Sequence, residues 1–343
     1  MIYILLIIFT HQLFSSDFNL QNEIPIQIEV PGDLNGDGVI DIIDIVILTN
    51  LILNDTPYAS IADLNNDGLI NIIDVIVVVN FILDDNISEN SYGSDETLDI
   101  ITWNLQNFPK HNNTVDTLSF IIDDLNLDIV ALQEIESTSA LSELSDNLGD
   151  NWLDYRSENS SWGELSYLIN SETVEINNIY TILNNSEYYF AYRPPYVLDC
   201  DYNGENYILI NIHYKCCDGS ESRRLESSEL LDEYISLNFS NKKVVILGDF
   251  NDLLIDDPNV FEPFLSEPSE YYFVDYEIAS GTSSSWSFPS WPSHIDHILI
   301  TNELFDNYED VRTLLIDSMY FNNLNNYDNI VSDHRPIAIK INN

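Results

Sequence analysis

Apolar, β-branched runs alternate with polar segments from residue 98 to the end of the chain. Runs of this kind are typical of buried β-strands. They predict strands at Leu98–Trp103, Asp128–Leu132, Tyr207–Ile212, Lys243–Leu247 and Ile337–Ile341. Two other segments place apolar residues at helical spacing and predict helices, Val115–Leu125 and Arg224–Leu237. Strands that alternate with helices predict an α/β domain.

Polar residues follow four of these strands, and a fifth polar string precedes the last strand. The strings are Trp103-Asn104, Gln133-Glu134, Ile212-His213, Gly248-Asp249-Phe250-Asn251 and Ser332-Asp333-His334-Arg335-Pro336. Loops at strand ends, held by a rigid sheet, are where catalytic groups usually lie. Carboxylates, amides and two histidines gathered in one place suit a divalent metal and a proton-transfer pair. They do not suit a serine or cysteine nucleophile.

A repeat precedes this domain, because Gly32–Asp44 recurs thirty residues later as Ala62–Asp74. Each copy places oxygen ligands at loop positions 1, 3, 5, 9 and 12, a backbone carbonyl at position 7 and glycine at position 6, which is the pattern of a calcium loop. The ligands of the first loop are Asp33, Asn35, Asp37, Val39, Asp41 and Asp44, and those of the second are Asp63, Asn65, Asp67, Leu69, Asn71 and Asp74. Two bound Ca²⁺ ions are expected.

An apolar stretch follows each loop, Ile45–Leu53 and Val75–Leu83. Propensity alone would allow strands, but the calcium loops favour helices. Paired loop-helix units with Asp at position 12 resemble dockerin type I modules, over about Pro31–Asp85. The resemblance implies a small all-α module at residues 31–86 that docks onto a cohesin-like protein. Apolar Ile42-Ile43 and Ile72-Ile73 stand where the better-known dockerins often carry hydroxyls, so the partner stays open.

A polar linker is expected at residues 87–97, and a second domain at 98–343. The five strings of that domain, with Ile295-Asp296-His297-Ile298 between the fourth and fifth, resemble the endonuclease/exonuclease/phosphatase superfamily, which includes deoxyribonuclease I. The resemblance spans Leu98–Ile341. It implies two mixed β-sheets packed face to face with helices outside.

The same resemblance assigns a metal side and a proton-transfer side to the site. Glu134 would be the principal ligand of Mg²⁺ or Mn²⁺, and Asn104 and Asp333 would complete the metal site. A neutral His334, near its ordinary pKa of about 6.5, would take a proton from water. Asp296 would hold the other nitrogen of that imidazole.

Four further residues are expected around the scissile phosphate. Asp249 and Asn251 would orient the attacking water and a phosphate oxygen. His213 would hydrogen-bond the phosphate or protonate the leaving oxygen. Glu164 is the candidate to orient His213, and a plain surface position is the alternative for this glutamate.

The charge of the chain is unusual for a protein that binds nucleic acid. Its 343 residues carry a formal net charge of −47, and no Lys or Arg precedes Thr97. The basic footprint of a nucleic-acid-binding protein is therefore absent. The positions of the few Lys and Arg residues become informative about substrate binding. Substrate contacts are expected from Arg193, Lys215, Arg223 and Arg224, with ordinary surface ion pairing as the alternative for the last two. Phe288, Trp286 and Trp291 would stack on a base or pack in the core.

The first sixteen residues contain an apolar run of about eight residues, which is too short to span a bilayer and suits a signal peptide. This predicts secretion. Of the three cysteines, adjacent Cys216 and Cys217 seldom bridge each other, so Cys200 with one of them is the expected disulfide.

These features together predict a secreted, metal-dependent phosphodiesterase, most simply a nuclease acting on DNA or RNA. A phosphatase or a sphingomyelinase-type phosphodiesterase on the same fold is the first alternative, because a fold does not fix a substrate. A calcium-dependent docking or scaffold protein with an inactive second domain is the other.

Overall fold

A computed structural model describes residues 32–36, 40, 42–53, 60–64, 69–72, 74–75, 78, 91–158, 163–321 and 323–342. The chain divides into two compact units, Met1–Asp85 and Asn86–Asn343. The expected signal peptide and the calcium ligands Asp37, Val39, Asp41, Asn65 and Asp67 lie outside the described residues. None of the described helices is long and apolar enough to cross a membrane.

The first unit contains helix α1 (Ile42–Leu53) and the 3₁₀ turn η1 (Ser60–Ala62). Leu48, Ala62 and Val78 form its buried apolar cluster. The helix expected at Ile45–Leu53 is confirmed, whereas most of the one expected at Val75–Leu83 lies outside the described residues.

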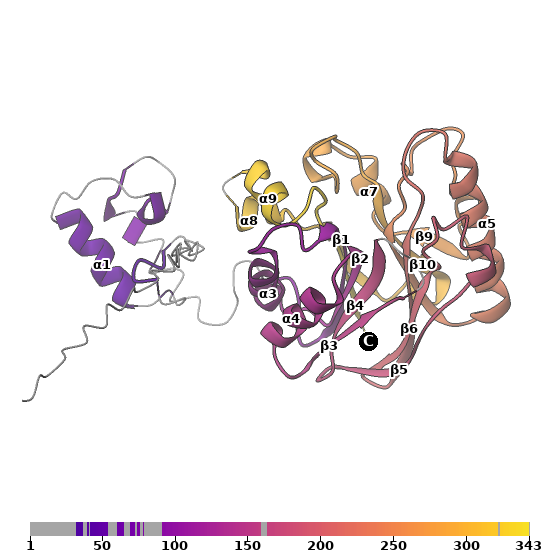
Figure 1. Cartoon of the computed structure of the whole chain (residues 1–343), viewed down its shortest axis with the longest axis horizontal. Helices are drawn as coiled ribbons and strands as arrows, with labels where there is room; N and C mark the ends of the chain where they lie inside the picture. The colour runs from indigo at the N-terminus through magenta and orange to yellow at the C-terminus, as the bar shows by residue number, and fades with distance from the viewer. Residues whose placement is uncertain are drawn as a thin grey trace, which may run out of the picture. The chain divides into compact units, whose positions relative to one another are not determined.

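The second unit contains two six-stranded mixed sheets (Figure 1). The first sheet has the order β11-β12-β1-β2-β4-β3, with β11 Tyr308–Thr313, β12 Ile337–Asn342, β1 Thr97–Phe108, β2 Ile129–Ile135, β4 Glu164–Asn170 and β3 Trp152–Arg156. The second has the order β5-β6-β7-β8-β10-β9, with β5 Val174–Thr181, β6 Tyr196–Tyr202, β7 Glu205–His213, β8 Lys243–Asp249, β10 Asp296–Thr301 and β9 Tyr271–Phe273.

Helices cover the outer faces of the sheets, with α3 and α4 on one side and α5 on the other (Figure 1). The helices are α3 Thr114–Leu125, α4 Thr138–Leu148, α5 Glu221–Asn238, α6 Glu262–Leu265, α7 Tyr276–Ala279, α8 Ile316–Met319 and α9 Leu324–Ile330. The 3₁₀ turns are η2 Asn184–Ser186, η3 Ser283–Ser285 and η4 Asn302–Leu304.

Alternating side chains of β1 show how one strand serves two apolar layers. Leu98 and Ile100 pack into the cluster shared by the two sheets, whereas Ile101 and Trp103 pack into the cluster under α3 and α4. This follows from the two-residue period of a strand. The five strands, the two helices and the face-to-face sheets expected from the sequence are all confirmed.

Strand direction brings the polar strand ends together. β1 is parallel to β2, and β7 is parallel to β8, so each pair ends at one edge of its sheet. Antiparallel β10 starts at the same place, because Asp296 pairs with Asp249. A buried hydrogen bond of 2.8 Å from Gln133 Nε2 to Asn211 Oδ1 joins the two sheets just beneath these ends.

The expected disulfide from Cys200 is wrong, since all three cysteines are free. Cys200 pairs with Tyr207 in the register of β6 and β7, and Cys216 lies beyond the end of β7 at His213. The strand from Tyr207 to His213 spans roughly 20 Å. A disulfide needs Cα atoms within about 7 Å.

Candidate active site

Asn104, in the C-terminal half of β1, connects two carboxylates. Its Nδ2 donates to Asp249 Oδ2 over 3.0 Å and to Glu134 Oε1 over 3.3 Å. Its Oδ1 accepts the backbone N–H of Gln106 over 2.9 Å, which fixes the orientation of the amide. The residues expected at the ends of three separate strands therefore meet in one place.

Unusual backbone conformations orient the side chains of the site. Glu134 has φ 62° at a register irregularity between β2 and β4, and Asn251 has φ 55°. Non-glycine residues in this region are uncommon and gather at functional sites. Gly248 has φ 147°, and a Cβ there would lie 2.0 Å from the carbonyl oxygen of Ile212. Glycine thus allows β7 and β8 to approach where His213 and Asp249 emerge.

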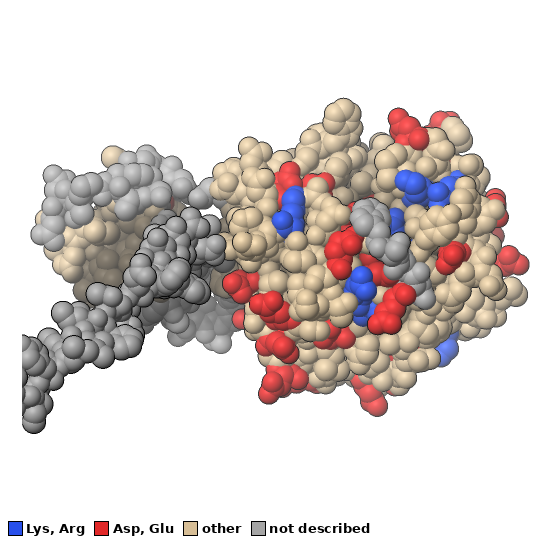
Figure 2. Space-filling model, in the orientation of Figure 1, with Lys and Arg blue, Asp and Glu red and all other residues tan. Residues whose placement is uncertain are grey.

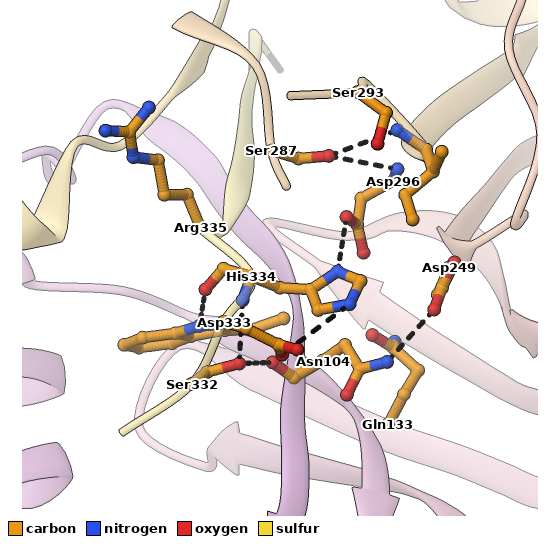
Figure 3. Close-up of polar contacts among 12 residues, drawn as sticks. Asn104, Gln133, Asp249, Ser287, Ser293, Asp296, Ser332, Asp333, His334 and Arg335 are labelled. Atoms are coloured by element: carbon orange, nitrogen blue, oxygen red, sulfur yellow. Dashed lines mark hydrogen bonds and ion pairs between the residues drawn. The ribbon is translucent and has the colours of Figure 1, made fainter. Parts of the chain in front are cut away.

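His334 is held by Asp296, whose Oδ2 lies 2.8 Å from Nδ1 of the imidazole (Figure 3). The backbone carbonyl of His334 accepts the indole N–H of Trp103, and the Phe288 ring lies 4.7 Å from the imidazole between centroids. Trp103 and Phe288 therefore fix the position of this histidine by hydrogen bonding and packing. The remaining nitrogen, Nε2, lies 3.8 Å from Asp333 Oδ1.

The charges around His334 favour its protonated form. Burial lowers the pKa of His334, but Asp296, Asp249 and Asp333 outweigh burial and raise that pKa to about 10. For this arrangement of carboxylates the pKa of His334 therefore lies above the ordinary value expected from the sequence. A divalent cation bound by Asp333 would oppose their effect.

The pKa of His213 is shifted in the opposite direction to that of His334. Burial, together with the charges of Arg193, His334 and Lys215, lowers the pKa of His213 well below its ordinary value. Its Nε2 lies 3.4 Å from Asp249 Oδ2 and 4.0 Å from Glu134 Oε1. The neutral imidazole thus faces the two carboxylates that Asn104 connects.

Glu164 does not orient His213, so that expectation is wrong. His213 Nδ1 has no hydrogen-bond partner in the part of the chain that the structure describes. Glu164 is fully buried at the start of β4, and its carboxylate accepts a hydrogen bond from Ser157 of the segment after β3. Ser157 lies beside the start of β4, because its backbone N–H donates to the carbonyl of Leu165 over 2.8 Å.

The metal-side residues fit a divalent cation. Asp333 Oδ1 is a buried oxygen without a hydrogen-bond partner among the described residues, and Asp333 Oδ2 accepts from Gln106 Nε2 over 2.7 Å. Burial, followed by Asp296, raises the pKa of Asp249 to about 7. Buried carboxylates are costly unless a cation or hydrogen bonds compensate them. Glu134, Asn104 and Asp333 offer the oxygen ligands that Mg²⁺ and Mn²⁺ prefer.

The expected substrate cations separate into two groups. Arg193 is 3% exposed, and Asp249 and Glu134 oppose the lowering of its pKa by burial, so its guanidinium faces the site. Arg224 is buried and pairs with Asp252 over 2.7 Å, which contradicts a substrate role. Arg335 pairs with Asp317 over 2.6 Å. On the face drawn in Figure 2, Lys and Arg are few and lie among Asp and Glu.

The expected calcium ligands that the structure describes show the symmetry of the repeat. Asp44 Oδ1 accepts the backbone N–H of Leu34 over 2.8 Å, and Asp74 Oδ1 accepts that of Leu64 over the same distance. Asp33, Asp44, Asp63 and Asp74 are all buried. Because no Lys or Arg lies in the first 96 residues, these buried carboxylates fit bound cations.

Comparison with known families agrees with this geometry. The Endonuclease/Exonuclease/phosphatase family matches residues 101–334, which include every site residue described above except Arg335 and the calcium ligands. The chain belongs to this family. The Dockerin type I domain matches residues 31–83. Members of the first family generally depend on divalent metals, and dockerins bind calcium. No curated protein matches the chain in sequence.

Solved structures share the fold of the endonuclease/exonuclease/phosphatase domain. TDP2 of D. rerio, solved with a single strand DNA product, has a TM-score of 0.58 and 15% identity, covering 73% of this chain and 100% of its own. The human Nocturnin catalytic domain with bound sulfate has a TM-score of 0.56 and 14% identity, covering 72% and 93%. An endonuclease/exonuclease/phosphatase from Bacteroides vulgatus has a TM-score of 0.55 and 15% identity, covering 71% and 98%.

The endonuclease/exonuclease/phosphatase domain contains a second buried cluster, to which the sequence pattern gives no catalytic or metal-binding role. Asp275, His294 and His297 have ligand-type atoms within 4.8 Å of one another. His294 Nδ1 accepts the backbone N–H of Ser287 over 3.1 Å, so its Nε2 carries the hydrogen that faces Asp275. The imidazole nitrogens of this cluster make hydrogen bonds to Ser287, Asp275 and Asp252, so the cluster joins three separate segments. The signal in the sequence is the pair of histidines flanking Asp296.

Proposed function

We propose that the chain is a secreted, metal-dependent phosphodiesterase that hydrolyses nucleic acid. The observation that carries this proposal is the convergence of the His334–Asp296 pair with Asn104, Glu134 and Asp249 at one edge of the two sheets. Belonging to the endonuclease/exonuclease/phosphatase family makes it a phosphodiester hydrolase. The nucleic-acid substrate and secretion are the proposed part.

The side chains divide the hydrolysis between them. Asp249 accepts a hydrogen bond from the attacking water, and the backbone N–H of Asn251, 2.9 Å from Asp249 Oδ1, holds that carboxylate in place. The Asp296-held imidazole of His334 holds or releases a proton at Nε2. His213 Nε2 and the buried Arg193 guanidinium face the same space and hydrogen-bond phosphate oxygens.

Glu134, Asn104 and Asp333 would hold the Mg²⁺ or Mn²⁺ ion. When bound, that ion stabilises the negative charge that develops on phosphate oxygens during in-line displacement. Water adds to phosphorus, one ester P–O bond breaks, and an alcohol and a phosphomonoester leave. No serine or cysteine of the chain has to form a covalent intermediate.

A nucleic-acid substrate is supported by the relative solved with a single strand DNA product, because a fold of this shape accommodates such a strand. Cations near the phosphate site point the same way: Arg193 faces Glu134 and Asp249, and Lys215 lies close enough to affect the pKa of His213. Neither observation separates DNA from RNA or endonuclease from exonuclease action.

The dockerin domain would bind two Ca²⁺ ions and recruit the enzyme to a cohesin-like protein. Its helix α1 exposes Ile42 by 69%, Ile43 by 50% and Val46 by 54%. An exposed apolar group of this size on a small domain is typical of a protein interface. A partner with an apolar contact surface is therefore proposed.

The deciding experiment measures which substrates the full chain hydrolyses. Supercoiled plasmid and single-stranded oligonucleotide are assayed with Mg²⁺ or Mn²⁺ beside a phospholipid, a phosphomonoester and bis(p-nitrophenyl) phosphate. Cleavage of nucleic acid that stops in chelator and returns with metal is the expected result. Hydrolysis of only the phospholipid or the phosphomonoester would show that the nuclease proposal is wrong.

A further inference from the structure

Two exposed tyrosines and a guanidinium form a surface beside the active site. Tyr188 is 51% exposed and Tyr192 is 54% exposed, and their ring centroids lie 6.1 Å apart with planes at 81°. Arg223 Cζ lies 4.1 Å from the centroid of the Tyr188 ring. We call Tyr188, Tyr192 and Arg223 the tyrosine–arginine ledge.

The ledge is held rigidly. The backbone N–H of Tyr192 donates to the carbonyl of Glu187 over 2.7 Å. Ala191 and Tyr192 have φ 52° and 64°, two consecutive left-handed conformations that non-glycine residues rarely adopt. Ser227 of helix α5 donates to the carbonyl of Tyr189 over 3.1 Å. The turn is thus fastened to α5, and its rings need little ordering before they bind a ligand.

The same turn connects the ledge to the phosphate site. Tyr192 is exposed, whereas the next residue, Arg193, is buried and donates to the carbonyl of Tyr214 over 3.4 Å. The charges of Asp249 and Glu134 act on that guanidinium. Consecutive Cα atoms lie about 3.8 Å apart. The backbone that places the Arg193 guanidinium at the phosphate site therefore also carries the exposed ring of Tyr192.

We propose that the ledge stacks an unpaired nucleobase next to the scissile phosphate. This deepens the proposed function and rests on it. Bases stack on tyrosine rings and on guanidinium planes with little dependence on sequence. A paired base inside a duplex keeps its faces covered, so single strands and frayed ends should be preferred. A choline headgroup would also seek aromatic rings, but the guanidinium of Arg223 repels a quaternary ammonium.

The test compares Michaelis constants for two substrates in the full chain. Tyr192→Leu and Tyr188→Leu should each raise KM for a short single-stranded oligonucleotide by about tenfold, the lower range of base–aromatic stacking. KM and kcat for bis(p-nitrophenyl) phosphate, which has no base, should not change. Tyr192→Phe keeps the ring and should restore oligonucleotide KM. Tyr272→Leu is the matched control, because Tyr272 is 37% exposed but pairs with Ile300, far along β10 from Asp296.

Each other outcome has a separate meaning. An unchanged oligonucleotide KM in both leucine variants contradicts base stacking on the ledge and leaves the nuclease proposal intact. Equal losses on both substrates also contradict base stacking, because the tyrosines would then only support Arg193. If the wild-type chain cleaves phospholipid or phosphomonoester and no nucleic acid, the proposed nuclease function is wrong. The proposal that the ledge stacks a nucleobase is then wrong as well.

Discussion

His297 donates a hydrogen bond from each ring nitrogen, from Nδ1 to Asp275 Oδ2 over 2.6 Å and from Nε2 to the backbone oxygen of Asp252 over 3.0 Å. A carboxylate and a carbonyl can only accept, so His297 is a buried imidazolium. Burial lowers its pKa, but Asp275 outweighs burial and raises it. The cation, on β10, joins Asp252 in the loop after Asn251 to Asp275 at the start of α7.

Replacing His297 should therefore destabilise the fold in a pH-dependent way. Removing one member of a buried pair costs about 3–5 kcal/mol, so His297→Leu should lower the free energy of unfolding by that amount near pH 6. A raised folded pKa gives stability that is fully present below the unfolded value of about 6.5 and is lost as pH rises through the folded value. The depressed pKa of Asp275 gives stability that is lost as pH falls below about 3.9.

The measurement is urea unfolding of wild type and His297→Leu at pH 5.5 and pH 9. The difference in unfolding free energy should be larger at the lower pH. His111→Leu is the control, because His111 is exposed. A difference that grows with pH would contradict a buried imidazolium.

Gly248→Ala should disrupt the join between β7 and β8. The new Cβ would lie 2.0 Å from the carbonyl oxygen of Ile212, within the strand pair that presents His213 and Asp249. Both the fold and the activity should suffer, as a lower melting temperature and little turnover. Gly204→Ala is the matched control, since Gly204 also has a positive φ but a Cβ added there would meet nothing within 4 Å. Gly204→Ala should lower the free energy of unfolding by only about 1–2 kcal/mol. Equal melting temperatures for the two variants would contradict the close approach.

Much of this site can be predicted from the sequence, because the strands are visible as apolar runs and the site residues lie at the strand ends. The sequence predicts that Asn104, Glu134, Asp249 and His334 lie together, and the structure brings them together. The sequence could not tell that Arg224 would be buried against Asp252, since surface and buried arginines look alike in one sequence. Nor could it show that the carboxylates around His334 raise its pKa, because that depends on three-dimensional distances.

Calcium should bind the dockerin domain in two independent steps. Position 12 of each loop is an aspartate, Asp44 or Asp74, and this position supplies the carboxylate that closes the coordination shell. Isothermal titration of the full chain should show two sites for wild type and one for either Asp44→Ala or Asp74→Ala. Phosphodiesterase activity of both variants with Mg²⁺ should match wild type, because the catalytic residues lie in the other unit. Unchanged calcium stoichiometry in both variants would remove these aspartates from the ligand set.

Loss of a metal-side or proton-transfer residue should lower turnover strongly while the fold persists. His334→Ala, Glu134→Ala and Asp249→Ala should each reduce kcat by at least about 10²-fold on bis(p-nitrophenyl) phosphate. Asp296→Asn should also lower kcat, because a neutral amide stabilises an imidazolium less than a carboxylate does. Circular dichroism should show folded variants, and Tyr272→Leu serves as a control for turnover. Near-normal turnover of His334→Ala would exclude it from the mechanism.

Binding to nucleic acid should depend only weakly on salt. Arg224 pairs with Asp252 over 2.7 Å and is removed from the expected substrate contacts, which then comprise Arg193, Lys215 and Arg223. Each neutralised phosphate contributes about 0.7–0.9 to the log–log slope of affinity against salt. The slope should therefore have a magnitude below about 3 for an oligonucleotide.

The matched pair Arg223→Ala and Arg224→Ala separates binding from folding. Arg223→Ala should weaken oligonucleotide binding and reduce the salt slope by about 1, with a smaller fall in melting temperature than Arg224→Ala. Arg224→Ala should instead lower the melting temperature, because it leaves the Asp252 carboxylate without its 2.7 Å partner. Fluorescence anisotropy at several salt concentrations and thermal unfolding measure the two effects. A steep slope in wild type, or a binding loss without destabilisation in Arg224→Ala, would show that Arg224 contacts the substrate after all.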